Sequence, residues 1–280
     1  SDVYKRQHVL FCNSEGVSYY DYRPMVSFMA VCIMEENGKM ENGYAGRSYR
    51  KGFEFMTDDV VDVIAREVVD RTAILFKAIK PKGGEMPVVM GSGGSGILLH
   101  EAIGHAFEAD FNRKDISIFA GQLNKKVCNE HINVVDDGTI PFNRGSVNLD
   151  DEGVEGQKTY IVKEGVLTSY LHDRISAKHY GVNPTGNGRR DTFRNLPIPR
   201  MRATYMEAGN MKEADIISKV KNGIFVDTFT NGQVQIGAGD FTFFVKSGYL
   251  IEDGKLTQPI KDINITVSYT HLRAHETGRN

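Results

Sequence analysis

The most informative segment of the chain is Leu98-Leu99-His100-Glu101-Ala102-Ile103-Gly104-His105-Ala106-Phe107-Glu108-Ala109-Asp110. Its two histidines, and the glutamate beside the first of them, are the side chains found on the helix of a zinc hydrolase. Neutral imidazole nitrogens bind Zn²⁺, and a neighbouring glutamate can accept a proton from water at the metal. The segment is therefore a candidate zinc site, with His100 and His105 as candidate ligands and Glu101 as candidate general base.

The spacing of this motif is H-E-x-x-x-H, one residue longer than the more common H-E-x-x-H. On a regular α-helix a five-residue step leaves two side chains roughly 140° apart, too far around the helix to share a metal. A single π-helical bulge would bring His105 back beneath His100, and Gly104 is where that distortion costs least. The alternative is a straight helix on which both histidines are ordinary core or surface residues.

Glu108 stands three residues after His105 and seven after Glu101, which places it on their face of the helix. We expect its carboxylate to accept an imidazole N–H from a ligand histidine, or to act near the metal itself. Asp110 follows two residues later, and the pattern gives it no defined role.

The helical pattern runs from Ile97 to about Phe111 and follows the glycine run Gly91-Ser-Gly-Gly-Ser-Gly96. Such a run can hold a phosphate at a helix N-terminus, so a nucleotide-binding module is an alternative function. The run lacks the Gly-Lys-Ser/Thr ending of a P-loop, and no acidic ribose partner follows at the expected place. We therefore expect a close-approach loop that directs the next helix.

Upstream of this segment the pattern is strand-rich. It predicts strands near His8–Phe11, Val17–Tyr20 and Val26–Met34, with hairpin signals at Asn37-Gly38 and Asn42-Gly43. Thr57 is typical of a helix N-cap, and the apolar spacing that follows predicts a helix to about Leu75. Pro81-Lys82-Gly83-Gly84 ends this region and is the best candidate for a domain boundary.

Downstream, a hairpin is predicted for residues 158–171 with its turn at Glu164-Gly165, and a helix near Glu213–Lys221. Further strands are predicted at 224–228, 233–236 and 241–246. Asp136-Asp137-Gly138 and Asp150-Asp151-Glu152-Gly153 lack EF-hand spacing and are predicted to be turns. The sequence thus predicts an α+β, two-domain mixed fold with a largely antiparallel sheet and a zinc-binding helix.

Composition excludes several classes of protein. Hydrophobic residues are 40% and charged residues 25% of the 280, which is typical of a globular chain. A net charge of −2 argues against a nucleic-acid or anionic-membrane partner, and the longest apolar stretch, 26–34, is too short to span a bilayer. Cys12, Cys32 and Cys128 are too few and too scattered for a disulfide scaffold, which favours a reducing, cytoplasmic compartment.

Both ends of the chain look foreign to the fold. Residues 1–7 and 267–280 resemble translated sequencing-adapter read-through, so we expect them to be non-native and to pack poorly against the body. His271 and His275, with Glu276, imitate a metal-binding helix face, but we exclude them from the site. The domain prediction is residues 8–82 for the C-terminal part of an N-terminal domain and 83–266 for a catalytic domain that continues beyond this chain.

Several strings outside the histidine segment carry a resemblance to a known family. After the segment and its continuation to Arg113, these strings are Val134-Val-Asp-Asp-Gly-Thr139, Gly145-Ser-Val147, Asp150-Asp-Glu-Gly153, Pro184-Thr-Gly-Asn-Gly-Arg-Arg190 and Leu196-Pro-Ile-Pro-Arg-Met201. In this order they resemble the TldD/PmbA family of zinc metalloproteases, and specifically its catalytic TldD branch. The resemblance extends from about Pro87 to Ile265, and residues 8–80 look like the end of the preceding domain of that family.

The resemblance implies that His100 and His105 bind Zn²⁺ and that Glu101 activates the water. It also implies a third ligand, a cysteine near the family's C-terminus, a place that no cysteine of this chain occupies. The chain alone is therefore expected to bind zinc poorly, because catalytic sites normally offer three protein ligands.

The family further implies unfolded or modified peptides as substrates, and a homodimer or a heterodimer with a related non-catalytic subunit. The rival function is that non-catalytic scaffold subunit, and the intact H-E-x-x-x-H favours the enzyme. Asn187-Gly188-Arg189-Arg190 could clamp a peptide carboxylate, although a structural turn is the simpler expectation.

Overall fold

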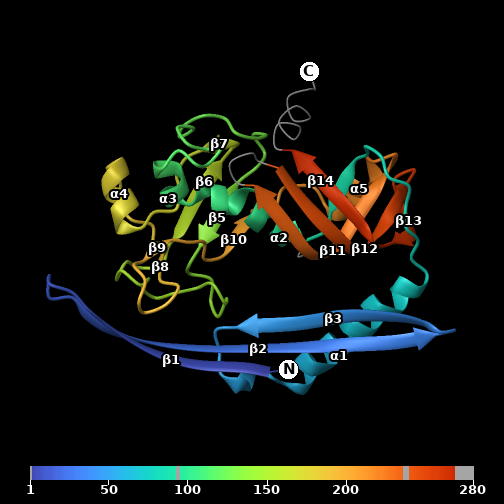
Figure 1. The fold of residues 1–280 in the computed structure, drawn as a ribbon, viewed down its shortest axis with the longest axis horizontal. Coiled ribbons are helices and arrows are strands. Elements are labelled where there is room, and N and C mark those ends of the chain that lie inside the picture. The colour runs from blue at the N-terminus through green and yellow to red at the C-terminus, as the bar shows by residue number, and fades with distance from the viewer. Residues whose placement is uncertain (1, 93–94, 236–239, 269–280) are drawn as a thin grey trace.

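The computed structural model describes residues 2–92, 95–235 and 240–268. A three-stranded ribbon of sheet (residues 2–49) lies along one side of two lobes (Figure 1). The first lobe comprises residues 105–206, and the second comprises residues 86–90, 213–235 and 240–268. The sheets are mostly antiparallel and the helices are short, so the predicted α+β class is confirmed.

The ribbon contains β1 (Asp2–Cys12), β2 (Ser18–Glu36) and β3 (Lys39–Tyr49), paired antiparallel in that order. The turn between β2 and β3 is at Asn37-Gly38, as predicted. Both residues have positive φ, 54° and 78°, which a two-residue hairpin turn of this kind requires. β2 is a single strand of 19 residues where the sequence pattern predicted two shorter ones.

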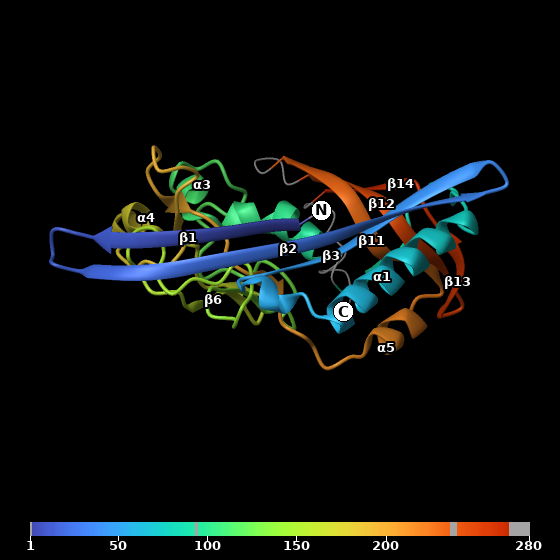
Figure 2. The same ribbon diagram turned by 90° about the horizontal axis from the view of Figure 1, so that it is seen from below.

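Helix α1 (Asp58–Ala73) follows the ribbon and runs along it beneath the second lobe (Figure 2). The Thr57 side chain caps it by accepting a hydrogen bond from the Val60 N–H, as the sequence predicted. Short 3₁₀ turns precede and follow the helix at Phe53–Phe55 and Ile74–Phe76. The helix buries Ile64 and Val68 against Ala45 of β3, so the ribbon and α1 share a small core.

The hairpin turn predicted at Asn42-Gly43 is wrong, because both residues lie inside β3 opposite Cys32 and Ile33. The glycine has another purpose. A Cβ at Gly43 would lie 2.4 Å from the Oγ1 atom of Thr72, a buried residue of α1. Glycine therefore lets the strand and the helix approach each other closely, a signal that resembles turn chemistry when only the sequence is read.

The chain ends also differ from expectation. Residues 2–7, expected to pack poorly, are the first part of β1 and pair in register with residues 23–28 of β2. Val267 and Ser268 are the last two residues of β14 (Ile263–Ser268) and pair with β12 (Asp240–Glu252). His271 and His275 lie outside the described residues. The extended, β-branched pattern of both ends suffices to continue neighbouring strands.

The second lobe is built on a sheet of order β13-β12-β11-β4, with β14 also paired to β12. Its other strands are β4 (Val88–Met90), β11 (Asn222–Gln235) and β13 (Lys255–Ile260), and β4 runs parallel to β11. Helix α5 (Glu213–Ser218) buries Ile217 against this sheet. The separate strands predicted at 224–228 and 233–236 form one strand as far as Gln235, and residue 236 lies outside the described residues. Register shifts between Val226 and Asn231 break the alternation of the sequence.

The first lobe contains a sheet of order β10-β5-β6-β7. Its strands are β5 (Val134–Asp137), β6 (Lys158–Lys163), β7 (Val166–Leu167) and β10 (Thr204–Met206), and a separate pair is formed by β8 (Gly188–Arg189) and β9 (Ile198–Pro199). Helices α3 (Ala109–Arg113) and α4 (Arg174–Tyr180) complete the lobe. The predicted turn at Glu164-Gly165 is confirmed by its positive φ angles of 50° and 75°, although β7 ends four residues earlier than predicted.

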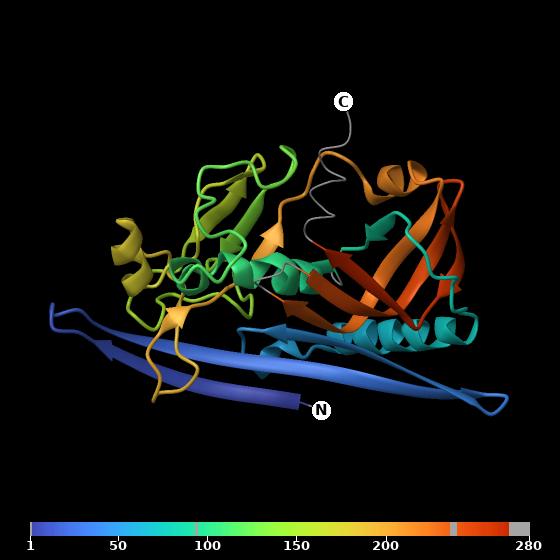
Figure 3. The same ribbon diagram turned by 45° about the horizontal axis from the view of Figure 1, so that its top comes forward.

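The histidine segment lies between the two lobes (Figure 3). It consists of α2 (Ser95–Leu98), a π-helical turn (Leu99–Gly104) and a 3₁₀ turn (His105–Phe107). Ile103 packs against the apolar cores of both lobes, which fixes the segment at their junction. The helix predicted from 97 to 111 is interrupted at Glu108, which is extended with ψ 126° and forms a β-bridge with Leu171.

The close-approach glycine loop is confirmed at its first residue. A Cβ at Gly91 would lie 2.7 Å from the Phe225 ring and 3.0 Å from the Val226 carbonyl oxygen, and Gly91 donates its N–H to that oxygen. Residues 93–94 of the run lie outside the described residues. No helix within the described residues is long and apolar enough to cross a membrane.

A buried histidine in the first lobe should make stability depend on pH. His172 is 2% exposed and packs against the rings of Tyr170 and Tyr180, and burial lowers its pKa to about 4. Below about pH 6.5 the unfolded chain takes up a proton that the folded chain refuses. Stability is therefore lost as the pH falls from about 6.5 to about 4, by about 3 kcal/mol in total.

We expect urea unfolding at pH 7 and pH 4.5 to show this loss, and His172→Phe to show a smaller one. An equal pH dependence in the two proteins would contradict the assignment to His172.

Candidate metal centre

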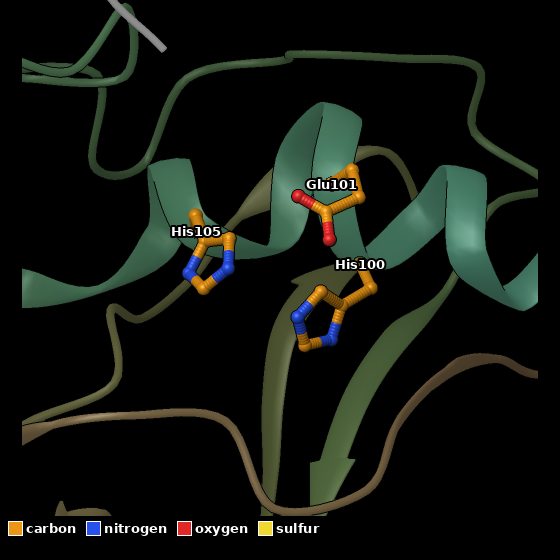
Figure 4. A group of neighbouring side chains, drawn as sticks. All are labelled: His100, Glu101 and His105. Carbon is orange, nitrogen blue, oxygen red and sulfur yellow. The ribbon is translucent and has the colours of Figure 1, made fainter. Parts of the chain in front are cut away.

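The two histidines of the segment face each other across the π-helical turn. Their ring centroids are 4.8 Å apart with an interplanar angle of 82°, where a regular helix would point them apart. Figure 4 shows both rings on one side of the helix, with the Glu101 carboxylate beside the gap between them. The predicted bulge and the shared face are confirmed, and the role of each residue stays a prediction.

Gly104 ends the π-helical turn, but its conformation is that of an ordinary right-handed helix (φ −58°, ψ −51°). Space is what this position requires. A Cβ there would lie 2.4 Å from the Met201 sulfur and 3.2 Å from the Leu99 carbonyl oxygen. The glycine thus allows Met201, which follows β9 in the first lobe, to pack directly against the histidine segment.

His100, Glu101 and His105 each offer one ligand atom, and these atoms lie within 4.8 Å of one another. Within the described residues, these three side chains form the one group of potential metal ligands that lie this close together. Two imidazoles beside a carboxylate fit the donors that zinc prefers. The three cysteines lie away from this group, on β1, on β2 and beside the core of the first lobe. The described residues therefore supply no cysteine as a third ligand at this site.

Glu108 contacts His105 as the sequence suggested it would. Its carboxylate is fully buried, and Oε2 lies 3.0 Å from the His105 Nδ1 atom. This hydrogen bond raises the pKa of His105. With Nδ1–H donated to Glu108, the Nε2 atom is left as the metal-binding nitrogen, which is the usual way a carboxylate fixes the tautomer of a ligand histidine.

Two further groups hold Glu108, and sequence reasoning missed both. The Arg200 guanidinium donates to Oε2 at 3.1 Å, and the Met201 N–H donates to Oε1 at 3.3 Å. Arg200 also pairs with Asp110 at 3.4 Å, so Asp110 has a place in this network. Arg200 and Met201 are the last two residues of Leu196–Met201, one of the strings on which the family resemblance rests. That resemblance was the one sequence signal that pointed to these two residues.

The two histidines titrate in opposite directions. Partial desolvation of its ring lowers the pKa of His100, and the neighbouring His105 and Arg189 lower it further. At neutral pH His100 is therefore in the neutral form that a metal requires. His105 holds its proton to a higher pH because of Glu108, so metal binding at His105 must displace that proton.

Several residues of the remaining motifs stabilise the fold. Asn187 is buried, and its amide donates to Asp136 Oδ2 and to the Arg200 carbonyl oxygen, so it ties β5 to the segment that carries Arg200. The Asp150 carboxylate accepts N–H groups from Glu152, Val154 and Gly188 and so builds the predicted turn. Asp136 and Asp137 are the last residues of β5, so the predicted turn begins only at Asp137, whose Oδ1 atom accepts the Thr139 N–H at 2.8 Å.

Two protein-family models match this chain. Residues 83–275 match the model of the PmbA/TldA metallopeptidase C-terminal domain, and residues 3–76 match that of the PmbA/TldA metallopeptidase central domain. The two matches meet between residues 76 and 83, in the region of the Pro-Gly segment.

Two curated relatives illustrate the similarity. A metalloprotease TldD homolog of Haemophilus influenzae is 43% identical over 266 residues, covering 93% of this chain and 55% of the relative. A zinc metalloprotease TldD homolog of Saccharolobus solfataricus is 33% identical over 220 residues, covering 78% of this chain and 49% of the relative. The chain thus spans about half the length of the curated relatives that it matches.

A solved structure shares the fold. TldE from Thermococcus kodakarensis superposes with a TM-score of 0.80 at 23% identity, covering 97% of this chain and 60% of the other. At this identity the likeness shows the fold alone.

Proposed function

Because this chain belongs to the PmbA/TldD family of metallopeptidases, we propose that it carries the zinc-binding helix of a peptidase for unfolded or modified peptides. The observation that carries the proposal is the approach of His100 and His105 to a ring distance of 4.8 Å, with Glu101 beside them. Single π-helical turns within helices occur frequently at functional sites, which supports the proposal.

In this proposal His100 and His105 hold the metal, and a cysteine near the C-terminus of the longer protein, as the family resemblance implies, provides the third protein ligand. Zinc, when bound, polarises the scissile carbonyl and lowers the pKa of water. A Glu101 carboxylate oxygen accepts the proton of the attacking water and passes it to the leaving amine nitrogen. Glu108 keeps the His105 ring in one orientation and one tautomer through its bond to Nδ1.

We further propose that the protein acts as a homodimer or as a heterodimer with a related subunit. β2 supports this proposal, since its alternating residues Met29, Val31 and Ile33 are more than half exposed and form an apolar row along one face. We also assign the protein to the cytoplasm, an assignment that the three free cysteines support.

The test of the function uses a version of the chain extended to the length of its relatives. We expect it to hydrolyse flexible peptides, to lose this activity when a chelator removes the metal, and to regain it with added Zn²⁺. The 280-residue chain, assayed beside it, should retain little zinc after dialysis because it offers two imidazoles. Hydrolysis that survives complete removal of the metal would refute the proposed function.

A further inference from the structure

A cavity of about 910 Å³ lies between the ribbon and the first lobe, and its wall is strongly basic. β1 supplies two basic residues of this wall, Lys5 and Arg6. Six further arginines, from β2, from the residue after β3 and from the first lobe, also line it: Arg23, Arg50, Arg144, Arg189, Arg190 and Arg202. Asp151 is the one carboxylate among the lining residues that the structure describes. For a chain with a net charge of −2, this is a marked local excess of positive charge.

Some of these arginines serve the fold. The Arg23 guanidinium donates to Asp21 at 2.7 Å, to Asp151 at 3.0 Å and to the Leu149 carbonyl oxygen at 2.7 Å, and so fastens β2 to the first lobe. The side chain of Arg202 donates to the carbonyl oxygens of two glycines before and within β8. Because these two guanidinium groups already donate to acceptors within the protein, they have fewer N–H groups left for a ligand.

Three other arginines have no such partner. Within the described residues, Arg50, Arg144 and Arg189 form no ion pair and their guanidinium groups donate no hydrogen bond to a side chain. Arg50 is partly buried, and desolvation together with the charge of Arg23 lowers its pKa, although Asp21 and Asp151 act in the opposite direction and a guanidinium stays protonated in proteins. Arg144 and Arg189 are exposed. Three guanidinium groups that line one cavity without a direct ion pair to a described residue favour an anionic ligand.

The cavity adjoins the candidate metal centre through Met201. This residue lines the cavity, while its backbone N–H donates to Glu108 and its sulfur packs beneath Gly104. The basic cavity and the candidate metal centre are therefore neighbours that share Met201.

We propose that this cavity binds a carboxylate group of the peptide substrate and so gives the peptidase a preference for acidic segments or for a chain end. The inference rests on the proposed function, because it assigns the ligand to a peptide. The planar fork of a guanidinium matches a carboxylate, with two parallel N–H···O bonds, better than it matches a neutral side chain. The volume is that of a site for a small ligand or a few residues.

Binding is measured by calorimetry on the extended, zinc-loaded chain carrying Glu101→Gln, so that no peptide is cleaved. Three flexible heptapeptides of glycine, serine and alanine are compared. One has a central aspartate and an amidated end, one a central asparagine and a free carboxylate end, and one a central asparagine and an amidated end. The first two distinguish a side-chain carboxylate from a terminal one, and the third is neutral at both places.

We expect at least one of the carboxylate peptides to bind about tenfold more tightly than the neutral peptide. Arg189→Ala should abolish this difference and Arg189→Lys should restore part of it, because the charge returns without the fork. Arg50→Met should act in the same direction. Arg66→Ala is the matched control, since it removes an exposed arginine from α1, away from the cavity, and should change nothing.

Equal affinity for all three peptides would overturn the proposal, and so would an equal loss in Arg189→Ala and Arg66→Ala. The second result would mean general attraction between charges. Failure of the proposed function is recognised separately. In that case the extended wild-type chain would not cleave the neutral peptide at any concentration, while the calorimetry would still report on the cavity.

Discussion

Replacing Glu101 with glutamine is expected to lower the peptidase turnover of the extended chain by about 10²–10⁴-fold while its zinc content stays the same. Glutamine has nearly the shape of glutamate but cannot accept the proton of the attacking water. The carboxylate lies beside the two imidazoles. In our proposal it is not a zinc ligand, so its replacement should leave the zinc affinity unchanged. Zinc content and turnover are measured on the same preparation.

The controls are His100→Ala and His105→Ala. Each removes an imidazole from a site that has two, so both variants should lose metal and activity together. A Glu101→Gln protein that keeps full turnover, or one that loses its zinc, would mean that Glu101 has been given the wrong role.

The second prediction concerns Glu108, whose side chain is fully buried. Glu108→Ala is expected to lower the free energy of unfolding by about 3 kcal/mol, because it leaves the Met201 N–H without its acceptor and Arg200 without its buried counter-charge. The same substitution releases the His105 ring. Zinc affinity should therefore fall by about 10–100-fold. Urea unfolding and a zinc competition titration measure the two effects.

Asp110→Asn separates these two effects. Asp110 pairs with Arg200 but, within the described residues, forms no hydrogen bond or ion pair with His105. Its replacement should therefore cost stability and leave zinc affinity close to that of the wild type. If Glu108→Ala and Asp110→Asn lowered zinc affinity equally, the zinc affinity would not depend on the orientation of His105 by Glu108.

Local features of this fold could be predicted from the sequence. The cap at Thr57, the turns at Asn37-Gly38 and Glu164-Gly165, and the π-helical turn at His100–His105 depend on residues close together in the chain. The bulge followed from one physical condition, that two ligands five residues apart must share a face. Helix α4 was missed although Asp173 caps it and Gly181, with φ 66°, ends it, because seven residues give too short a periodic pattern.

Features that depend on distant contacts could not be predicted. Arg200 reaches Glu108 across 92 residues of sequence, and nothing in the local pattern of either one indicates the other. The packing of Met201 against Gly104 and of Thr72 against Gly43 likewise joins separate elements, so each glycine was assigned a local conformational role. The three arginines Arg50, Arg144 and Arg189 come from the residue after β3, from the loop between β5 and β6 and from β8, and only the fold assembles them.

The π-helical turn also bears on how such sites arise and how they are found. A turn of this kind takes up one additional residue locally, and the chain on either side keeps its direction. Deletion of one residue between Glu101 and His105 would leave an ordinary helical turn with the two histidines four apart, and Glu108 would still follow His105 by three. A single insertion or deletion therefore suffices to convert one zinc-helix spacing into the other. A search restricted to the shorter spacing passes over this chain, even though its two imidazoles lie face to edge within a metal's reach.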